Sequence, residues 1–370
     1  MSPRLEPRGE PSRLLTWLSP VIAVAATLVA GAVLFALLGF DPARALWLFF
    51  ITPVSTVYGL TELGVKATPL CLIAVGLALG FRANVWNIGA EGQLTLGAVA
   101  AGGLALAFWG DGGFWLLPLM VIGGAVGGMV WGAIPALLRT RFNANEILVS
   151  LMLTYVATLI LSYLVHGPWK DPDGFAFPES RMFEDSARLP DLVPGSRLHI
   201  GALFALAAVA GAWVLIGRTL VGFELKVVGT APQAARYAGF SHNRMIWLTF
   251  LITGALAGIA GMAEVSGPIG LLQPQISPGY GFTAIIVAFL GRLHPGGILL
   301  ASLLLALSYL GGEAVQIGMG LPLAATGVFQ GMLLFFLLAS DILITHRVRL
   351  GRRPAAAPAA PRAAAPEAGE

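Results

Sequence analysis

The sequence predicts an all-α protein that crosses a membrane many times. Of its 370 residues, 57% are hydrophobic and only 11% are charged, and the mean hydropathy is +0.81. Soluble domains carry about 25% charged residues. The apolar residues gather in repeated runs of about twenty, the length of a membrane-spanning helix. They lack the alternation of a membrane β-barrel, so a polytopic helical bundle is favoured.

About ten apolar runs predict about ten spans, some of them broken or re-entrant. The first run follows three arginines, as in a signal peptide, but it is too long for the apolar region of one, so we expect a retained helix. The eighth run is too short to cross a bilayer fully. The expected helices cover residues 14–39, 64–81, 88–109, 114–138, 146–165, 199–217, 245–265, 281–291, 297–312 and 324–341.

The basic residues predict an orientation. If the N-terminus is inside and the spans alternate, sixteen of the 22 Lys and Arg residues fall on the inner side. Cytoplasmic loops carry such an excess, so both termini are expected in the cytoplasm. The expected divisions are a tail at 1–13, a membrane domain at 14–345 and a tail at 346–370 that is rich in Ala and Pro and expected to be disordered.

Two segments between the runs stand out. Residues 166–199 hold five prolines and six acidic residues and are expected to form an external loop without a core of its own. Residues 218–244 form a basic segment on the inner side. There Pro232 suits the first turn of a short helix, and Ala234, Ala235 and Ala238 would form a face of small side chains. Such a helix suits docking into a groove of another protein, although an ordinary basic loop is an equal reading.

The sequence lacks the signatures of common catalytic sites. None of the three lysines follows a glycine, so there is no GxxxxGK[ST] phosphate loop. The five histidines are scattered and form no HExxH motif, which leaves a metal or protease site without support. The one cysteine, Cys71, lies in an apolar run, is expected to be a buried structural thiol and has no partner for an intramolecular disulfide.

The most informative stretch is 81–94 (FRANVWNIGAEGQL), a polar, glycine-rich junction between two apolar runs. Polar groups at such a place are costly unless they line a water-filled route or meet partners. Glu91 could bond with Arg82 or cap an exposed helix N-terminus. A polar cap at the start of a helix and a substrate path that includes Asn87, Glu91 and Gln93 are equally compatible with these residue types.

Glycines mark two further features. Three GxxxG patterns, beginning at Gly123, Gly124 and Gly254, predict close packing of helices. The segment 273–297, which contains Tyr280 and Phe282, holds turn signals at both ends of a short apolar run. Broken helices of this kind often line transport sites, and a simple turn between helices fits equally well.

These stretches, in this order, resemble the membrane permease subunits of bacterial ATP-binding-cassette (ABC) importers. The branch is that of nucleosides and simple sugars, within the branched-chain amino acid and ribose permease family. The resemblance covers about residues 15–341. The sequence departs from the family pattern at Trp86, at Thr154 and at 230–231. The matched segments are 85–93, 145–157, 218–240 and 281–298.

The resemblance implies alternating access driven by a separate ATPase. This chain would form the path for a nucleoside or simple sugar, without catalytic or metal-binding residues. The residues implied for the substrate path are Asn87, Glu91, Gln93, Tyr280 and Phe282. Those implied for coupling to the ATPase are Gly229, Ala234, Ala235, Arg236 and Gly239.

The resemblance also implies partners. They are an ABC ATPase that would hold ATP and Mg²⁺, a second permease expected to be a different chain, and an extracytoplasmic substrate-binding lipoprotein. The complex would lie in lipid of the bacterial inner membrane, with no nucleic-acid partner and no cofactor in this chain.

Two other classes remain open from the residues. A stand-alone secondary transporter or channel for a small polar solute would need paired intramembrane carboxylates, whereas those here are scattered. A membrane-embedded enzyme would need a catalytic cluster, and the sequence offers no recognisable one.

Overall fold

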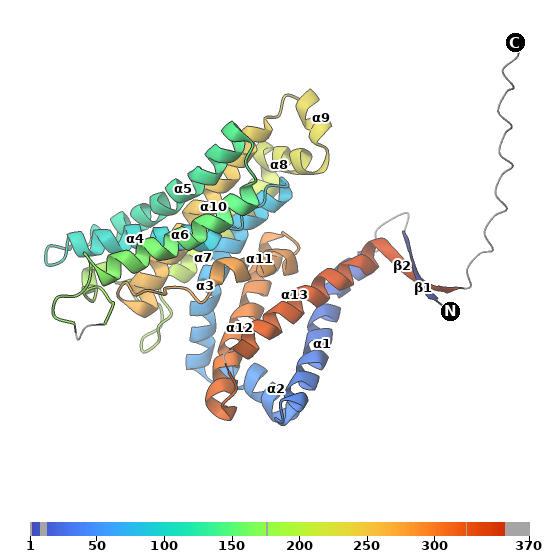
Figure 1. The fold of residues 1–370 in the computed structure, drawn as a ribbon, viewed down its shortest axis with the longest axis horizontal. Helices are drawn as coiled ribbons and strands as arrows, with labels where there is room; N and C mark the ends of the chain where they lie inside the picture. The colour runs from blue at the N-terminus through green and yellow to red at the C-terminus, as the bar shows by residue number, and fades with distance from the viewer. Residues whose placement is uncertain (1, 8–12, 175–176, 323, 352–370) are drawn as a thin grey trace, which may run out of the picture.

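The molecule is a helical bundle with one short pair of strands at its side (Figure 1). It is described by a computed structural model that covers residues 2–7, 13–174, 177–322 and 324–351. Within those residues, six helices are long and apolar enough to cross a membrane. This finding confirms the predicted all-α membrane class.

Each predicted run overlaps a helix of the structure. The six long apolar helices are α3 (Val57–Arg82), α5 (Leu116–Phe142), α6 (Glu146–His166), α7 (Gly201–Arg218), α10 (His242–Glu264, continued by a π-helical turn at Val265–Ile269) and α12 (Pro295–Met319). The other helices that match predicted runs are α1 (Arg13–Leu37), α4 (Ala90–Ala107), α11 (Tyr280–Leu290) and α13 (Ala324–Thr345).

Three further helices are short. The basic inner segment folds into α8 (Leu220–Thr230) and α9 (Pro232–Tyr237), and α9 begins at the proline that predicted it. The helix α2 (Pro42–Phe50) was not predicted. Its start is nevertheless encoded in the sequence, because the Asp41 carboxylate accepts a hydrogen bond from Ala43 N–H and Pro42 takes the first helical position.

The helix α3 lies at the centre of the bundle. It contacts α7, α10, α11 and α12. Of the 18-residue apolar stretch within α3, 83% is buried in the protein. Its residues 67–81 are uncharged and mostly apolar on all sides, as expected of an enclosed helix. On one side of it α4, α5, α6 and α10 pack together, and on the other α1, α2, α12 and α13 (Figure 1).

The helices α5, α6 and α7 are peripheral, because only 22% of the 18-residue apolar stretch of each is buried. Their outward side chains are large and apolar, which suits contact with lipid. Examples are Val130 on α5, Leu159 on α6 and Trp213 on α7.

The predicted glycine packing holds α5 against α10. A Cβ on Gly254 would lie 2.5 Å from the carbonyl oxygen of Gly128, so the two backbones touch without intervening side chains. Gly258 packs in the same way against Gly124. Small residues permit this close approach of membrane helices.

The strands involve both predicted tails. Strand β1 (Ser2–Pro7) pairs antiparallel with β2 (His346–Gly351). Residues 346–351 were expected to be disordered and instead form β2, because β1 supplies the backbone partners of its hydrogen-bond ladder. The rest of the predicted disordered tail, 352–370, lies outside the described residues.

The described residues of segment 167–199, which was expected to be external, are mostly irregular and are fastened to the bundle by backbone hydrogen bonds. Ser180 N–H donates to Leu272 O at 2.9 Å, Phe183 N–H to Gly270 O at 2.8 Å, and Leu189 N–H to Ser266 O at 2.8 Å. A short 3₁₀ turn is present at Asp185–Ala187. The segment therefore lies over the end of α10 as a cap.

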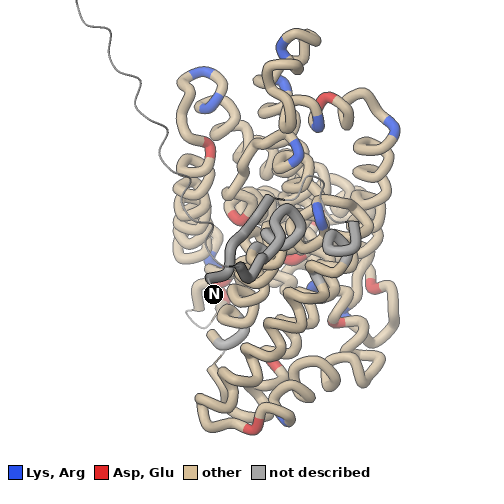
Figure 2. The backbone as a smooth tube through the Cα atoms, turned by 90° about the vertical axis from the view of Figure 1, so that its right-hand side faces the viewer, with Lys and Arg blue, Asp and Glu red and all other residues tan. Residues whose placement is uncertain are grey.

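Lys and Arg residues gather at one end of the bundle. Figure 2 shows them concentrated at the end that carries α8 and α9 in Figure 1. The opposite end holds the outer segment 167–199. This distribution is the structural counterpart of the charge asymmetry in the sequence.

Candidate functional site

The polar junction between α3 and α4 forms a tight turn. Asn84 has a left-handed backbone with a φ of 57°, and Val85 N–H donates to Gly80 O at 2.9 Å, which closes the end of α3. The Asn84 side chain accepts a hydrogen bond from Trp86 Nε1 at 3.1 Å. The chain then passes close to α6, where Ile88 N–H donates to Ser150 Oγ at 3.1 Å.

Asn87 and Gln93 meet inside the protein. Asn87 Nδ2 donates to Gln93 Oε1 at 3.0 Å, and Asn87 Oδ1 accepts from Gly89 N–H at 3.0 Å. Both side chains are buried. Their polar atoms therefore satisfy each other and the turn in this conformation, as buried polar groups must.

Glu91 caps the N-terminus of a helix that is distant in sequence. Its Oε2 accepts a hydrogen bond from Gly281 N–H, in the first turn of α11, at 2.6 Å. At the same helix start, the Ser277 hydroxyl accepts from Tyr280 N–H at 2.8 Å. A carboxylate at a helix N-terminus meets unpaired N–H groups and the positive end of the helix dipole.

The predicted alternatives for Glu91 are thereby resolved. An Arg82–Glu91 bond is wrong, because the Arg82 guanidinium instead donates twice to the carbonyl oxygen of Leu293, from Nε at 3.0 Å and from Nη2 at 2.9 Å. Glu91 does bond a helix N-terminus, but the helix is α11 and its start is buried, whereas an exposed N-terminus was expected.

The aromatic members of the predicted path point to different environments. Tyr280 is buried, and its ring meets that of Tyr309 edge-on at 5.4 Å. Phe282 is 39% exposed on the surface of α11. The structure thus encloses Asn87, Glu91, Gln93 and Tyr280 within the bundle and presents Phe282 outside it.

The sequence did not point to the interior hydrogen bonds on the other side of α11. Thr283 Oγ1 lies 2.7 Å from the Tyr309 hydroxyl and donates to Gln330 Oε1 at 3.5 Å. The only sequence signal was that these polar side chains lie in apolar runs. They link α11 to α12 and α13.

The basic inner segment divides into a packed part and an exposed part. Gly229 lies against the carbonyl group of Arg82 so closely that no Cβ would fit. Ala235 is only 2% exposed and packs in a cluster with Ala83, Val85 and Leu225. The predicted small-residue face is therefore split between the interior and the surface, because Ala235 points inward.

Much of the exposed surface of this segment lies on the rest of α9 and at its end. Ala234, Arg236, Ala238 and Gly239 are exposed. Tyr237 was not singled out from the sequence and is 94% exposed, although a tyrosine in a short basic loop is a usable signal of a contact residue. We call these five residues the α9 surface; other side chains of the segment, such as Leu220 and Phe223 of α8, are exposed as well.

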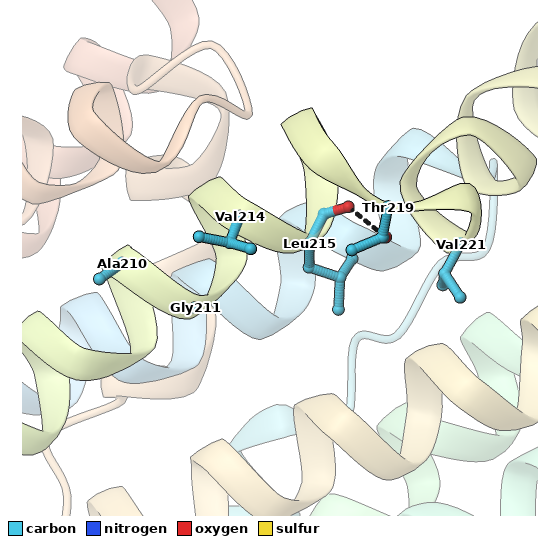
Figure 3. A pocket seen from close by; sticks show the side chains of 6 residues that line it. All are labelled: Ala210, Gly211, Val214, Leu215, Thr219 and Val221. Atoms are coloured by element: carbon cyan, nitrogen blue, oxygen red, sulfur yellow. Dashed lines mark hydrogen bonds between the residues drawn. The ribbon is translucent and has the colours of Figure 1, made fainter.

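A shallow apolar hollow of about 510 Å³ lies where α7 meets α8 (Figure 3). The Thr219 hydroxyl at its edge is occupied, since it donates to Leu215 O at 2.6 Å. The lining offers almost no polar group to a solute and suits an apolar contact such as a lipid chain. It is lined by Ala210, Gly211, Val214, Leu215, Thr219 and Val221.

Charged side chains tie the outer segment to α3. Arg197 donates from Nε to Glu62 Oε1 at 2.9 Å and from Nη2 to Glu62 Oε2 at 2.5 Å. This two-pronged geometry is the strong form of the pair, and the hydrogen bond to Glu62 raises the pKa of the Arg197 guanidinium. The neighbouring His199 is buried, and burial lowers its pKa to about 4 although Asp191 opposes the shift.

No group of three or more His, Cys, Asp and Glu side chains in the described part of the chain is placed to hold a metal ion. Cys71 is buried among apolar residues of α3, as predicted. The arrangement is one of hydrogen bonds between helices and of exposed contact surfaces.

The chain is similar to known transport proteins. A family profile described as "Branched-chain amino acid transport system / permease component" matches residues 59–338. The glucose ABC transporter permease protein TsgB13 of Haloferax volcanii is 39% identical, over 96% of both chains. The guanosine ABC transporter permease protein NupP of Bacillus subtilis is 32% identical, over 89% of this chain and 94% of its own.

Bacillus subtilis contains a second, less similar relative. The guanosine ABC transporter permease protein NupQ is 27% identical over 69% of this chain and 79% of its own length. The family profile covers most of the chain, and TsgB13 matches it nearly end to end. The chain therefore belongs to the family of branched-chain amino acid transport system permease components.

Proposed function

We propose that this chain is a permease subunit of an ABC importer and forms part of the path for a simple sugar or a nucleoside. The observation that carries the proposal is the near-full-length similarity to TsgB13, which is named as a glucose permease. NupP, which is named as a guanosine permease, supports the nucleoside alternative. Both solutes are small and polar, so a polar route through the membrane is needed.

The proposal includes about ten crossings, with both termini and the α8–α9 segment in the cytoplasm. The excess of Lys and Arg at the α9 end supports this orientation (Figure 2). The α9 surface would then face a separate ATPase that holds ATP and Mg²⁺. The exposed Tyr237 and Arg236 are of the residue types enriched at protein interfaces.

The transport step would be alternating access. ATP binding can shift the permease between outward-facing and inward-facing states only if the ATPase interacts differently with the two. The candidate path residues are enclosed in the conformation described here, apart from Phe282. They would form the path on rearrangement of the helices or at a contact with a second permease.

A second permease of different sequence is part of the proposal. Bacillus subtilis has two guanosine permease proteins, and this chain is more similar to NupP than to NupQ. An extracytoplasmic binding protein would deliver substrate to the outer segment 167–199. The surrounding lipid would cover the apolar faces of α5, α6 and α7.

Reconstituted transport tests the function. The tagged chain would be purified with its native partners, and the co-purified binding protein screened against sugars and nucleosides. The best ligand would then be measured for uptake into proteoliposomes, with an ATPase lacking its phosphate-loop lysine as control. We expect uptake that depends on ATP and on the intact ATPase. Uptake by this chain alone, without ATP, would instead identify a secondary transporter or channel.

A further inference from the structure

The turn between α3 and α4 contacts the α8–α9 segment on one of its sides. The backbone of α8 at Gly229 lies directly against the Arg82–Ala83 peptide, with no room for a side chain between them. Ala83 and Val85 are buried in the same cluster as Leu225 and Val228 of α8. Close-packed interiors transmit displacement because they have little free volume to absorb it.

On its other side the same turn holds the end of α11. The Arg82 guanidinium donates two hydrogen bonds, at 3.0 and 2.9 Å, to the carbonyl oxygen of Leu293. Leu293 and Arg292 have left-handed backbones, with φ of 54° and 58°. Such a conformation in a residue other than glycine costs about 1–3 kcal/mol and persists only where the surroundings enforce it. Arg82 supplies part of that enforcement.

Three aromatic rings add a second contact at this end of α11. Phe81 stacks on Phe289 of α11 with ring centroids 5.0 Å apart, and Trp86 lies 5.0 Å from Phe81 and 5.8 Å from Phe289. Aromatic pairs at such separations are favourable beyond the area that they bury. The turn therefore contacts the end of α11 through both polar and apolar side chains.

The far end of α11 is held by the same short stretch of chain. Glu91 follows the turn, and its carboxylate accepts from Gly281 N–H at 2.6 Å. The backbone of Gly281 also packs against that of Glu91 so closely that a Cβ would not fit. Residues 81–91 thus contact α11 near its start and near its end, although they lie about 190 positions earlier in the sequence.

We propose that residues 81–91 act as a clamp that makes α11 move as one body with α8, and that Arg82 is its positioning residue. Movement imposed on α8 reaches the turn through the contact at Gly229. It then reaches α11 through Arg82, the aromatic rings and Glu91. The clamp rests on the proposed function, because a separate ATPase has to move α8. Its output is the displacement of Phe282, the exposed aromatic residue of α11.

A second connection between the same parts exists and is less direct. Trp213 of α7, the helix that precedes α8, meets the ring of His294 edge-on at 5.5 Å. His294 adjoins Leu293 at the start of α12. This contact is a single ring pair on a half-exposed tryptophan, so we assign the main transmission to the clamp.

Spin-label distances in the complete complex test the clamp. Labels would be placed on cysteines introduced at Leu220 of α8, Phe282 of α11 and Val130 of α5, all exposed positions, while Cys71 is buried from the reagent. The complex with its ATPase and second permease would be measured in lipid nanodiscs with and without ATP. We expect the distance from 282 to 130 to change and the distance from 220 to 282 to stay constant.

Arg82→Gln should break this coupled movement. We expect the 220–282 distance to change with ATP in this variant and the number of ATP molecules hydrolysed per substrate imported to rise about fivefold or more. Arg82→Lys keeps the charge without the two-pronged geometry. In both measurements it should give values between those of wild type and Arg82→Gln. The matched control is Arg139→Gln, because Arg139 bonds Asn143 and Glu146 at the same end of the bundle. It should behave as wild type.

Several outcomes would overturn the clamp. One is an Arg82→Gln complex with a constant 220–282 distance and normal coupling. If that variant is poorly folded, Phe289→Leu serves instead, because it removes the ring contacts with an apolar replacement. Normal coupling in the Phe289→Leu complex would also overturn the clamp. A wild-type complex in which ATP changes no distance and drives no import would contradict the proposed function itself, and the clamp with it.

Discussion

At the scale of single residues, the position of Glu91 is the most consequential result. A carboxylate enclosed in an apolar bundle is expensive unless it is well bonded. Glu91 meets this demand through the N–H of Gly281 at the start of α11. A residue expected to line a path thus joins the α3–α4 region to the start of α11 in this conformation.

The first prediction concerns that bond. Glu91→Ala leaves Gly281 N–H buried and unpaired, and we expect a loss of about 1–3 kcal/mol in the free energy of unfolding. Glu91→Gln keeps an acceptor oxygen and should lose less. Glu313→Gln is the control, since Glu313 pairs with Lys66 at 2.8 Å but has a 45% exposed side chain, so about 0–1 kcal/mol is expected. Thermal unfolding in detergent measures all three, and equal stability of Glu91→Ala and wild type would contradict the capping role.

The second prediction is a dependence of stability on pH that arises from His199. Burial lowers its pKa to about 4, below the ordinary value of 6.5. The unfolded chain therefore binds a proton at higher pH than the folded one. Stability should fall as the pH drops from about 6.5 to about 4, by up to about 3 kcal/mol, and level off below.

The control for this effect is His199→Asn. In the native protein, His199 Nδ1 accepts from Gly201 N–H at 3.2 Å, and the Asn oxygen can take over that role without titrating. Unfolding measured between pH 4 and 7 should show that acidification lowers the free energy of unfolding less in the variant than in the native protein. Identical acid profiles in the two proteins would show that His199 does not contribute.

At the scale of elements, the contrast between α8 and α9 matters most. The helix α8 and the buried Ala235 pack onto the bundle, while the rest of α9 is presented outward. A short helix with one anchored residue has a fixed position, and a fixed position is what a docking element needs. The α9 surface of Ala234, Arg236, Tyr237, Ala238 and Gly239 is therefore separable by mutation from the packing beneath it.

The third prediction uses this separation. Tyr237→Ala should weaken recovery of the ATPase with the tagged chain by about thirtyfold and leave thermal stability unchanged, because hot-spot tyrosines contribute about 2 kcal/mol or more to binding. Ala235→Arg should instead lower stability, because it places a charge in a packed cluster. Tyr155→Ala on the exposed face of α6 is the control and should affect neither. Full ATPase recovery with Tyr237→Ala would place the dock elsewhere.

The elements also show how far the sequence could be read. Ten helices were predictable because long apolar runs report burial in lipid or protein. The short α2 and α8 were missed because packing, more than any periodic pattern, stabilises helices of their length. The short α11 was predictable because glycines bound it. The inward turn of Ala235 was not, since alanine is compatible with either face of a helix.

The sequence could predict which types of residue form the candidate site, but only in part which residues they bond to. The polar stretch 81–94 could be identified as a candidate site because it contrasts with the apolar runs beside it. That Arg82 bonds Leu293 and Glu91 bonds Gly281 could not be read from it, because the partners lie about 200 residues away and the contact depends on how the bundle closes. The proximity of Arg82 and Glu91 in sequence suggested a pair that the geometry does not form.

At the scale of the whole molecule, the exposed apolar faces and the enclosed candidate path residues fit the proposal that lipid and partner subunits complete the protein. The helices α5, α6 and α7 present large apolar side chains along their outer sides. Phe282 is exposed on α11 near the start of that helix. A permease partner that covers this region would bring the path residues toward an interface.

The fourth prediction concerns that partner. If a different chain completes the pair, a tagged copy of this protein should not recover an untagged copy expressed beside it. It should recover a second permease of the same family. Mass spectrometry of the purified complex, with distinguishable tags on two copies of this chain, measures both. Recovery of the untagged copy in equal amount would establish a homodimer.

The enclosure of α3 has a consequence for how the protein is made. A translating ribosome releases α3 well before α10, α11 and α12, the helices that later surround it. At about 5–20 residues per second, that interval is roughly ten to fifty seconds. During it α3 must sit in lipid, which its uncharged stretch 67–81 permits, and lipid must leave as the later helices arrive. Maturation of this protein therefore ends with an exchange of lipid for protein around its oldest central helix.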